Sequence, residues 1–178
     1  MELTAALFDL CSSSKRPIIA IDGPAGAGKT TLAEHLSAAL SLKYKVNVIH
    51  MDDLYNGWAK AFDHHLTDSL LAISSAHLLG KATSLSRYNW SKGAFNTAEV
   101  LPPAELLILE GVGSSQRAIR EFLTSSIWID IDPSKGLERV LARDGEAISD
   151  EMQMWLQLQE KHFRLDDSEK SADFVLTN

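Results

Sequence analysis

The chain has 178 residues, enough for one domain with a full hydrophobic core, and its 45% hydrophobic and 23% charged residues are ordinary for a soluble protein. A net charge of -7 argues against a general nucleic-acid binder, and no apolar run reaches membrane-spanning length. The single Cys11 cannot form an internal disulfide, and residues 1–10 lack the basic leader and apolar core of a signal peptide. We therefore expect a cytoplasmic protein that binds neither nucleic acid nor membrane.

A glycine-rich stretch stands out at residues 23–30, which read Gly-Pro-Ala-Gly-Ala-Gly-Lys-Thr. It matches the phosphate-binding pattern G-x-x-x-x-G-K-[ST], in which glycines let backbone N–H groups curl around phosphate oxygens. Lys29 would add a positive charge at the β- and γ-phosphates, and the Thr30 hydroxyl would bind Mg²⁺. The sequence thus predicts ATP and Mg²⁺ as cofactors. The residues expected to bind the nucleotide are Gly23, Pro24, Ala25, Gly26, Ala27, Gly28, Lys29, Thr30 and Thr31.

The surrounding pattern is that of alternating strands and helices. We expect strands at residues 17–22, 45–51, 105–111, 127–131 and 173–176, and helices at 1–10, 31–40, 62–79, 115–123, 136–144 and 150–163. Residues 81–103 lose their periodicity, and a stretch of this length inside a compact domain is usually a functional loop. The prediction is one α/β domain over residues 1–178, with three layers around a mainly parallel five-stranded sheet.

Acidic residues follow two of the expected strands. Asp52 and Asp53 come directly after the second strand, and Glu110 closes the third. In open α/β sheets ligands bind beyond the carboxyl ends of the strands, so these groups would lie beside the triphosphate. The predicted metal ligands are Thr30, Glu110 and, through a water molecule, Asp52 or alternatively Asp53. A plainer interpretation of Asp52 or Asp53, as a cap of the next helix, stays open.

Aromatic and basic side chains supply further candidates. Tyr88 and Trp90 lie in the expected loop, either at a binding site or as anchors to the core. Arg139 and Arg143 fall on one face of a helix, as a phosphate clamp or as a solvated face.

Four motifs give the chain a resemblance to a known family. They are the P-loop, Met51-Asp52-Asp53-Leu54-Tyr55, Arg87-Tyr88-Asn89-Trp90 and Leu109-Glu110-Gly111, and the segment 138–144 supports them. The chain resembles the uridine kinase group of P-loop kinases, the phosphoribulokinase/uridine kinase group, which is related to the nucleoside monophosphate kinases.

The resemblance implies a P-loop NTPase fold with strand order 2-3-1-4-5. It also implies that Asp52 is the base facing the acceptor hydroxyl and that Asp53, Tyr55, Tyr88 and Trp90 bind the acceptor. Arg139 and Arg143 would belong to a short lid near residues 139–150. They would act in catalysis together with Lys29 of the P-loop. The chain departs from the family at Asn89, where the family often has Asp, and in having a short lid with few arginines.

The acceptor can be narrowed from the residues themselves. The sequence of residues 19–29 is also similar to that of cytidylate kinases, so a nucleoside monophosphate is a rival acceptor. A phosphorylated acceptor needs cationic clamps, yet residues 52–86 contain no arginine, only Lys60 and Lys81 against four aspartates. We therefore expect a neutral, nucleoside-like small molecule. A nucleotide-binding ATPase or switch without an acceptor is the remaining alternative, and the sequence leaves open whether the chain forms a homo-oligomer.

Overall fold

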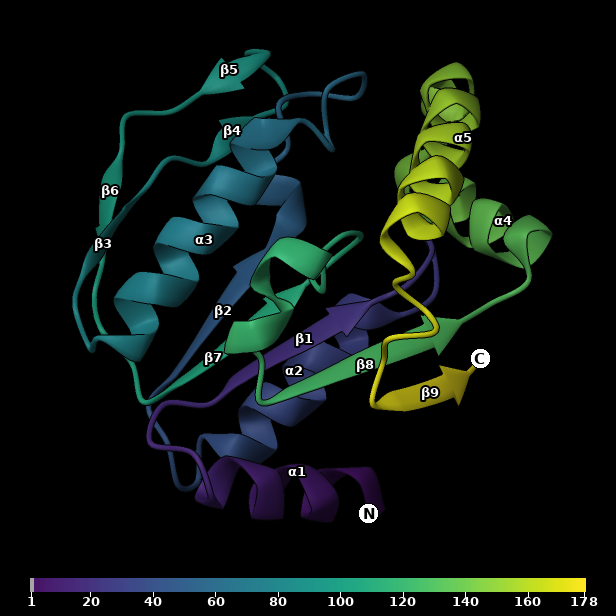
Figure 1. Cartoon of the computed structure of the whole chain (residues 1–178). Helices are drawn as coiled ribbons and strands as arrows, with labels where there is room; N and C mark the ends of the chain where they lie inside the picture. Colours follow the sequence, from purple (N-terminus) through teal and green to yellow (C-terminus); the bar gives the residue numbers. More distant parts are fainter. Residues whose placement is uncertain (1) are drawn as a thin grey trace.

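A five-stranded sheet forms the centre of the computed structural model, which describes residues 2–178 (Figure 1). Every neighbouring pair of its strands is parallel, and the order is β2-β7-β1-β8-β9. Counted along the chain these are strands 2-3-1-4-5, so the predicted order is confirmed. The strands are β1 (Ile18–Asp22), β2 (Val46–His50), β7 (Leu106–Glu110), β8 (Ser125–Asp130) and β9 (Phe174–Thr177).

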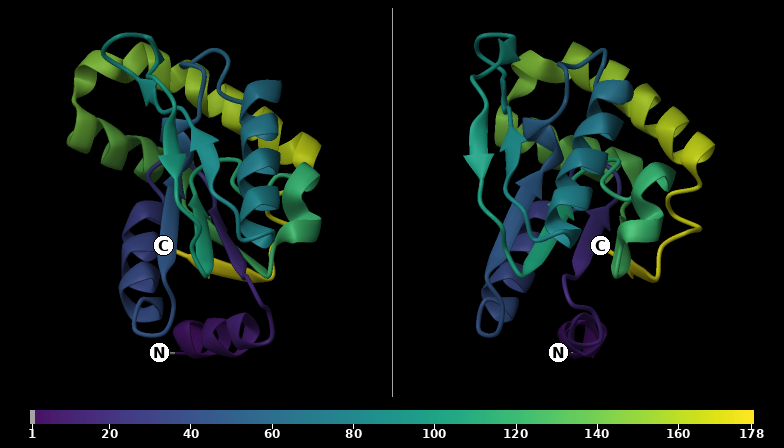
Figure 2. Two further views of the ribbon diagram at one scale, coloured as in Figure 1. Left: turned by 90° about the vertical axis from the view of Figure 1, so that its left-hand side faces the viewer. Right: turned by 60° about the vertical axis from the view of Figure 1, so that its left-hand side comes forward.

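Helices cover both faces of this sheet, which gives the three layers (Figures 1 and 2). One face carries α1 (Glu2–Ser12) and α2 (Lys29–Leu40). The other carries α3 (His64–Leu78), the short 3-10 helix η2 (Arg117–Phe122) and α5 (Ser149–Asp166). The helix expected from residue 1 is found from residue 2, since Met1 lies outside the described residues. None of the helices within residues 2–178 combines the length and apolar character needed to cross a membrane.

Alternation along the strands divides the core in two. In β7, Leu107 and Leu109 join the cluster beneath α3 and α5, while Leu106 and Ile108 join the cluster beneath α1 and α2. Because both faces are covered, the strand is apolar throughout, which is the pattern that identified it in the sequence. All five of its residues are buried.

The carboxyl ends of the strands carry the segments that build the site. The 3-10 helix η1 (Met51–Asp53) follows β2 directly, and α4 (Pro133–Asp144) follows β8. Asp132 caps α4 by accepting from the Ser134 and Lys135 N–H groups, and Pro133 occupies the first turn, where its missing N–H costs nothing. A further 3-10 turn, η3 (Glu146–Ile148), connects α4 to α5.

The segment 81–103 differs from the prediction of an irregular loop. It contains two short antiparallel ladders, β3 (Thr83–Leu85) with β6 (Glu99–Leu101) and β4 (Tyr88–Asn89) with β5 (Ala94–Phe95). Strands of two or three residues are too short to produce a readable hydrophobic period. Figure 2 shows these ladders standing beside α3 at the β2 edge of the sheet.

Candidate active site

The P-loop connects β1 to α2 and has the backbone shape that its glycines permit. Gly26 has φ 78° and Gly28, which caps α2, has φ 94°; both lie in the left-handed region. Space is also short at Gly26, where an added Cβ would lie 2.2 Å from the carbonyl oxygen of Gly136 in α4. The loop therefore needs glycine at this position for two independent reasons.

Lys29 begins α2, and its side chain folds back across the loop. Its Nζ donates to the Pro24 carbonyl at 2.7 Å, and the residue is 8% exposed. Burial lowers the pKa of Lys29 from its usual value, while the carboxylates of Asp22, Glu110 and Asp52 oppose that shift. The ammonium group of Lys29 thus lies among three carboxylates at the positive end of α2. A triphosphate bound there would neutralise the charge of the lysine.

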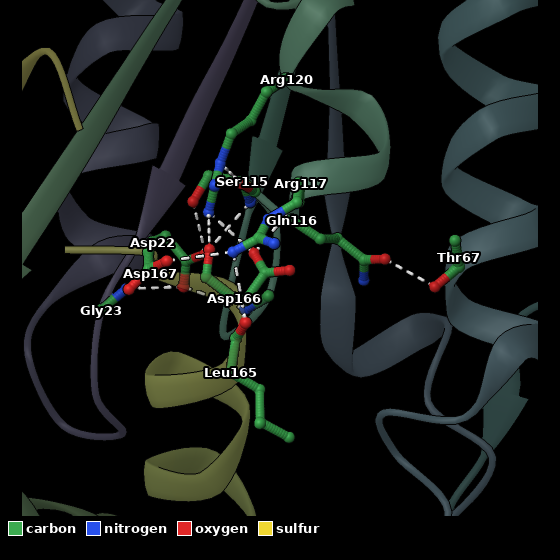
Figure 3. A network of polar contacts seen from close by, with 11 residues as sticks. Asp22, Gly23, Thr67, Ser115, Gln116, Arg117, Arg120, Leu165, Asp166 and Asp167 are labelled. Carbon is green, nitrogen blue, oxygen red and sulfur yellow. Dashed lines mark hydrogen bonds and ion pairs between the residues drawn. The ribbon is translucent and has the colours of Figure 1, made fainter. Parts of the chain in front are cut away.

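Asp22 is a structural residue of the site that the sequence did not single out (Figure 3). Its carboxylate is buried and accepts from the N–H groups of Gly23 at 2.8 Å and Gly113 at 2.9 Å, and from both N–H and hydroxyl of Ser115. These bonds join the start of the P-loop to the segment after β7. The available signal was an acid at a strand end directly before the glycine-rich loop.

Thr30 and Glu110 lie together at the expected metal position. The Thr30 hydroxyl donates to Glu110 Oε1 at 3.2 Å, and Nδ1 of His50, at the end of β2, lies 2.5 Å from the same oxygen. The hydrogen bond to Glu110 raises the pKa of His50, and burial opposes this. Hydroxyl and carboxylate oxygens are the ligands that Mg²⁺ prefers, so the donor set fits the predicted ion. His50 was missed because its partner is 60 positions away in the sequence.

The neighbouring acids Asp52 and Asp53 point to different surroundings. Asp52 is exposed on the wall of the main cavity, and partial desolvation by the surrounding protein, followed by the charge of Glu110, raises its pKa. Asp53 instead forms an ion pair with Arg87, in which it accepts a hydrogen bond from Nη1. Arg87 also pairs with Glu99. Asp53 is not among the residues lining the cavity and ties η1 to the segment 81–103. Neither residue caps α3, whose cap is Asp63.

One cavity of about 1130 Å³ brings most of the predicted residues together. Its phosphate end comprises residues 25–31 of the P-loop with Glu110; Gly23 and Pro24 lie outside the lining. Its aromatic end is lined by Tyr55, Trp58, Trp90, Val112, Met152 and Trp155. A third part, between α2 and the end of β9, is lined by Leu32, His35, Leu176, Thr177 and Asn178. Asp52 also lines this cavity.

The aromatic end contains two tryptophans, Trp58 and Trp155, that were not among the predicted acceptor-binding residues. Trp58 packs edge-on against Trp90 at 5.1 Å and against Trp155 at 5.9 Å between ring centroids. The Tyr55 ring lies 5.0 Å from that of Trp155, and its hydroxyl donates to the Val112 carbonyl. Tyr88 lies outside the lining and supports Trp90 at 5.1 Å. Trp155 belongs both to the core and to the cavity lining.

Arg139 and Arg143 lie one turn apart on α4 and both line the cavity. Arg139 Nη1 reaches the Gly26 carbonyl at 3.4 Å. Arg143 donates to both carboxylate oxygens of Asp144, at 2.7 and 2.6 Å, and its side chain is 67% exposed. Arg139 therefore stands against the P-loop, while Arg143 lines the same cavity and is paired with Asp144.

Comparisons with solved structures identify the fold. A structure described as a possible uridine kinase from Bacillus stearothermophilus superposes with a TM-score of 0.68 at 20% identity, covering 99% of this chain and 100% of that one. A D-glycerate 3-kinase from Cryptococcus neoformans has a TM-score of 0.64 at 12% identity, covering 99% and 94%. The chain thus has the P-loop NTPase fold of these structures.

Sequence identity to curated proteins is higher than to these structures, but it is confined to a short stretch. A bifunctional pantoate ligase/cytidylate kinase from Synechococcus elongatus is 57% identical over 42 residues, which is 23% of this chain and 8% of that protein. The match therefore spans less than a tenth of the relative's length. A family model described as an AAA domain matches residues 19–156, which is more than half of the chain and contains the P-loop, Asp52 and Glu110. The chain belongs to the family that this AAA-domain model describes.

Proposed function

We propose that this protein is a kinase that transfers the γ-phosphate of ATP to a hydroxyl group of a neutral, nucleoside-like acceptor. The observation that carries the proposal is the position of Asp52 in a cavity whose one end is a P-loop and whose other end is aromatic. Asp52 is the acid of this cavity that follows β2, at the carboxyl edge of the sheet, where open α/β folds bind ligands.

Each part of the cavity has a task in this reaction. The backbone N–H groups of the P-loop and the ammonium group of Lys29 hold the β- and γ-phosphates, and the third part of the cavity offers room for the nucleoside of ATP. Thr30 and Glu110, with Asp52, are the residues that would hold Mg²⁺, which when bound neutralises charge on the phosphate oxygens. Asp52 accepts the proton of the acceptor hydroxyl as that oxygen attacks.

The charge distribution supports a neutral acceptor. Among residues 2–178, the lysine and arginines that line the cavity are Lys29, Arg139 and Arg143, from the P-loop and α4, and none comes from segment 81–103 or α5, which contribute Trp90 and Trp155. Arg87, which precedes Trp90 in the sequence, is paired with Asp53 and Glu99 and does not line the cavity. A phosphorylated or carboxylated acceptor would lack a cationic partner there, while a flat ring would find aromatic surfaces.

A nucleoside monophosphate is the second candidate acceptor. It is favoured by the short stretch of high identity to bifunctional pantoate ligase/cytidylate kinases. In that case one of the two α4 arginines would have to bind the acceptor phosphate. The short lid would then be the element that recognises the acceptor as well as the triphosphate.

The test is a panel of nucleosides and nucleoside monophosphates incubated with the protein, ATP and Mg²⁺, with products identified by mass spectrometry. Lys29→Ala serves as the inactive control, because its charge acts directly on the triphosphate. A phosphorylated nucleoside formed by the wild type alone supports the proposal. Phosphorylation of monophosphates in preference to nucleosides would support the second candidate, and ATP hydrolysis unaffected by any acceptor would indicate an ATPase or switch.

A further inference from the structure

A glutamine of α5 connects the two ends of the cavity. Gln159 is buried, with 6% of its surface exposed, although glutamine is usually a surface residue. Its Oε1 accepts from the backbone N–H of Ala25 at 3.1 Å and from the indole Nε1–H of Trp155 at 3.1 Å. One oxygen atom is therefore shared by the P-loop and the aromatic end.

Both partners are donors only, which fixes the orientation of the amide. A backbone N–H and an indole N–H cannot accept a hydrogen bond, so the carbonyl oxygen of Gln159 must face them. The Trp155 ring packs against Tyr55 at 5.0 Å and Phe62 at 5.3 Å between centroids. A change at Gln159 would therefore reach the wall on which an acceptor ring would lie.

The far end of α5 is anchored to the base of the same loop (Figure 3). Arg120 donates to the carboxylate of Asp166 at 2.8 Å and to the Ser115 carbonyl at 3.0 Å. Ser115 in turn donates to Asp22, which precedes the P-loop. With its end held in this way, α5 acts as a fixed support from which Gln159 reaches the loop.

We propose that Gln159 is a positioning residue that fixes the P-loop relative to the aromatic end of the cavity. Through this bond it couples nucleotide binding to Trp155. This inference rests on the proposed function. P-loop N–H groups turn towards a bound phosphate, so filling the cradle changes the bond that Ala25 makes to Gln159. Hydrogen bonds that share an atom polarise one another, and the change passes to the Trp155 N–H.

The experiment is NMR of the ¹⁵N-labelled protein with Mg²⁺ and the non-hydrolysable analogue AMP-PNP at saturation. The Trp155 indole signal is assigned from its loss in Trp155→Phe. In the wild type, AMP-PNP is expected to shift both the Ala25 amide and the Trp155 indole signal. In Gln159→Met the Ala25 shift remains and the Trp155 shift is lost. Gln159→Glu keeps an oxygen that accepts from both donors, and it should retain the Trp155 shift.

Gln157→Met is the matched control, because Gln157 is exposed on the same helix. It should behave as the wild type. A Trp155 shift that is unchanged in Gln159→Met, or absent from the wild type while Ala25 responds, would overturn the coupling. If other amide signals of residues 25–31 respond in the wild type and Ala25 does not, the coupling is overturned as well. If none of these signals responds, nucleotide does not bind and the proposed function fails instead. The ligand-free spectra then decide the inference: Gln159→Met must move both signals and Gln157→Met neither.

Discussion

At the scale of single residues, adjacent side chains of the same type have different surroundings. Asp52 faces a cavity that contains Lys29 and Glu110, while Asp53 is neutralised by Arg87. A 3-10 turn directs two successive residues away from each other, so only one acid of the pair can reach the phosphates. This divergence is the reason why we propose Asp52, and not Asp53, as the base.

Replacing Arg143 by alanine tests whether the α4 arginines act on the transition state. Arginines of this kind can raise turnover by roughly 10³–10⁵, and the exposure of Arg143 puts it at or below the lower end. We expect kcat to fall by about 10²–10³ while the Kd for ATP changes less than about tenfold. Steady-state kinetics and calorimetry measure the two quantities, with Arg164→Ala, an exposed arginine of α5, as the control. Equal losses in kcat and in affinity would make Arg143 a ground-state binder.

Cys11 gives a prediction about pH. Burial raises the pKa of its thiol to about 11, and the charge of Lys43 only partly opposes this. The folded protein thus holds the thiol proton to a higher pH than the unfolded chain, whose cysteine has a pKa of about 8.5. The stability that this proton contributes is present below about pH 8.5 and is lost as the pH rises through about 11.

Alkylation by iodoacetamide measures the Cys11 thiolate directly, because the chain has no other cysteine. At pH 8 roughly 0.1% of a thiol with such a pKa is ionised, so labelling of the folded protein should be at least about a hundredfold slower than in guanidinium chloride. Equal rates in the folded and unfolded protein would contradict the raised pKa.

The residues found by sequence reasoning and those missed by it differ in a physical way. Lys29, Thr30 and Glu110 lie in local patterns whose backbone shape is dictated nearby, so their position could be predicted. Asp22 and His50 act through bonds to residues 60 or more positions away, and no local pattern encodes such a contact. The helical spacing of Gln159 places it on the core side of its helix, where it is buried, but its bond to Ala25 joins residues 134 positions apart and is not encoded locally.

At the scale of elements, the carboxyl edge of the sheet organises the site. The P-loop, η1 and α4 follow β1, β2 and β8, so three loops from one edge meet around one cavity. The strands and their order could be predicted because each is an apolar run of normal length. The short ladders of 81–103 could not, and their fold depends on contacts such as Arg87 with Asp53.

Trp90 tests the contribution of segment 81–103 to acceptor binding. Its ring lines the cavity and its Nε1–H donates to the Asp52 carbonyl at 3.1 Å. Stacking of a base on an aromatic side chain is worth roughly 1–3 kcal/mol, so Trp90→Ala should raise the acceptor KM about tenfold or more with little effect on kcat. Trp90→Phe should keep most of the ring contact and separate it from the hydrogen bond. Val100→Ala, exposed on β6, is the control, and an unchanged KM in Trp90→Ala would remove Trp90 from the acceptor site.

At the scale of the whole molecule, one parallel sheet holds a P-loop, an acid and an aromatic wall around a single cavity. The positive side chains of that cavity gather where a triphosphate would lie, and the aromatic wall is left uncharged. Fold, charge and shape are the grounds on which we propose phosphoryl transfer from ATP to a neutral molecule with a ring and a hydroxyl group.

The measurement that tests this most directly is acceptor-dependent ADP formation by the wild type, Asp52→Asn and Asp53→Asn, with nucleosides and nucleoside monophosphates as acceptors. General-base catalysis contributes typically about 10²–10⁴-fold, so Asp52→Asn should lose that much nucleoside-dependent turnover. Asp53→Asn should lose much less, because Asp53 contacts Arg87 and does not line the cavity. A nucleoside-dependent rate that is unchanged in Asp52→Asn, or a wild type that prefers monophosphates, would contradict the account.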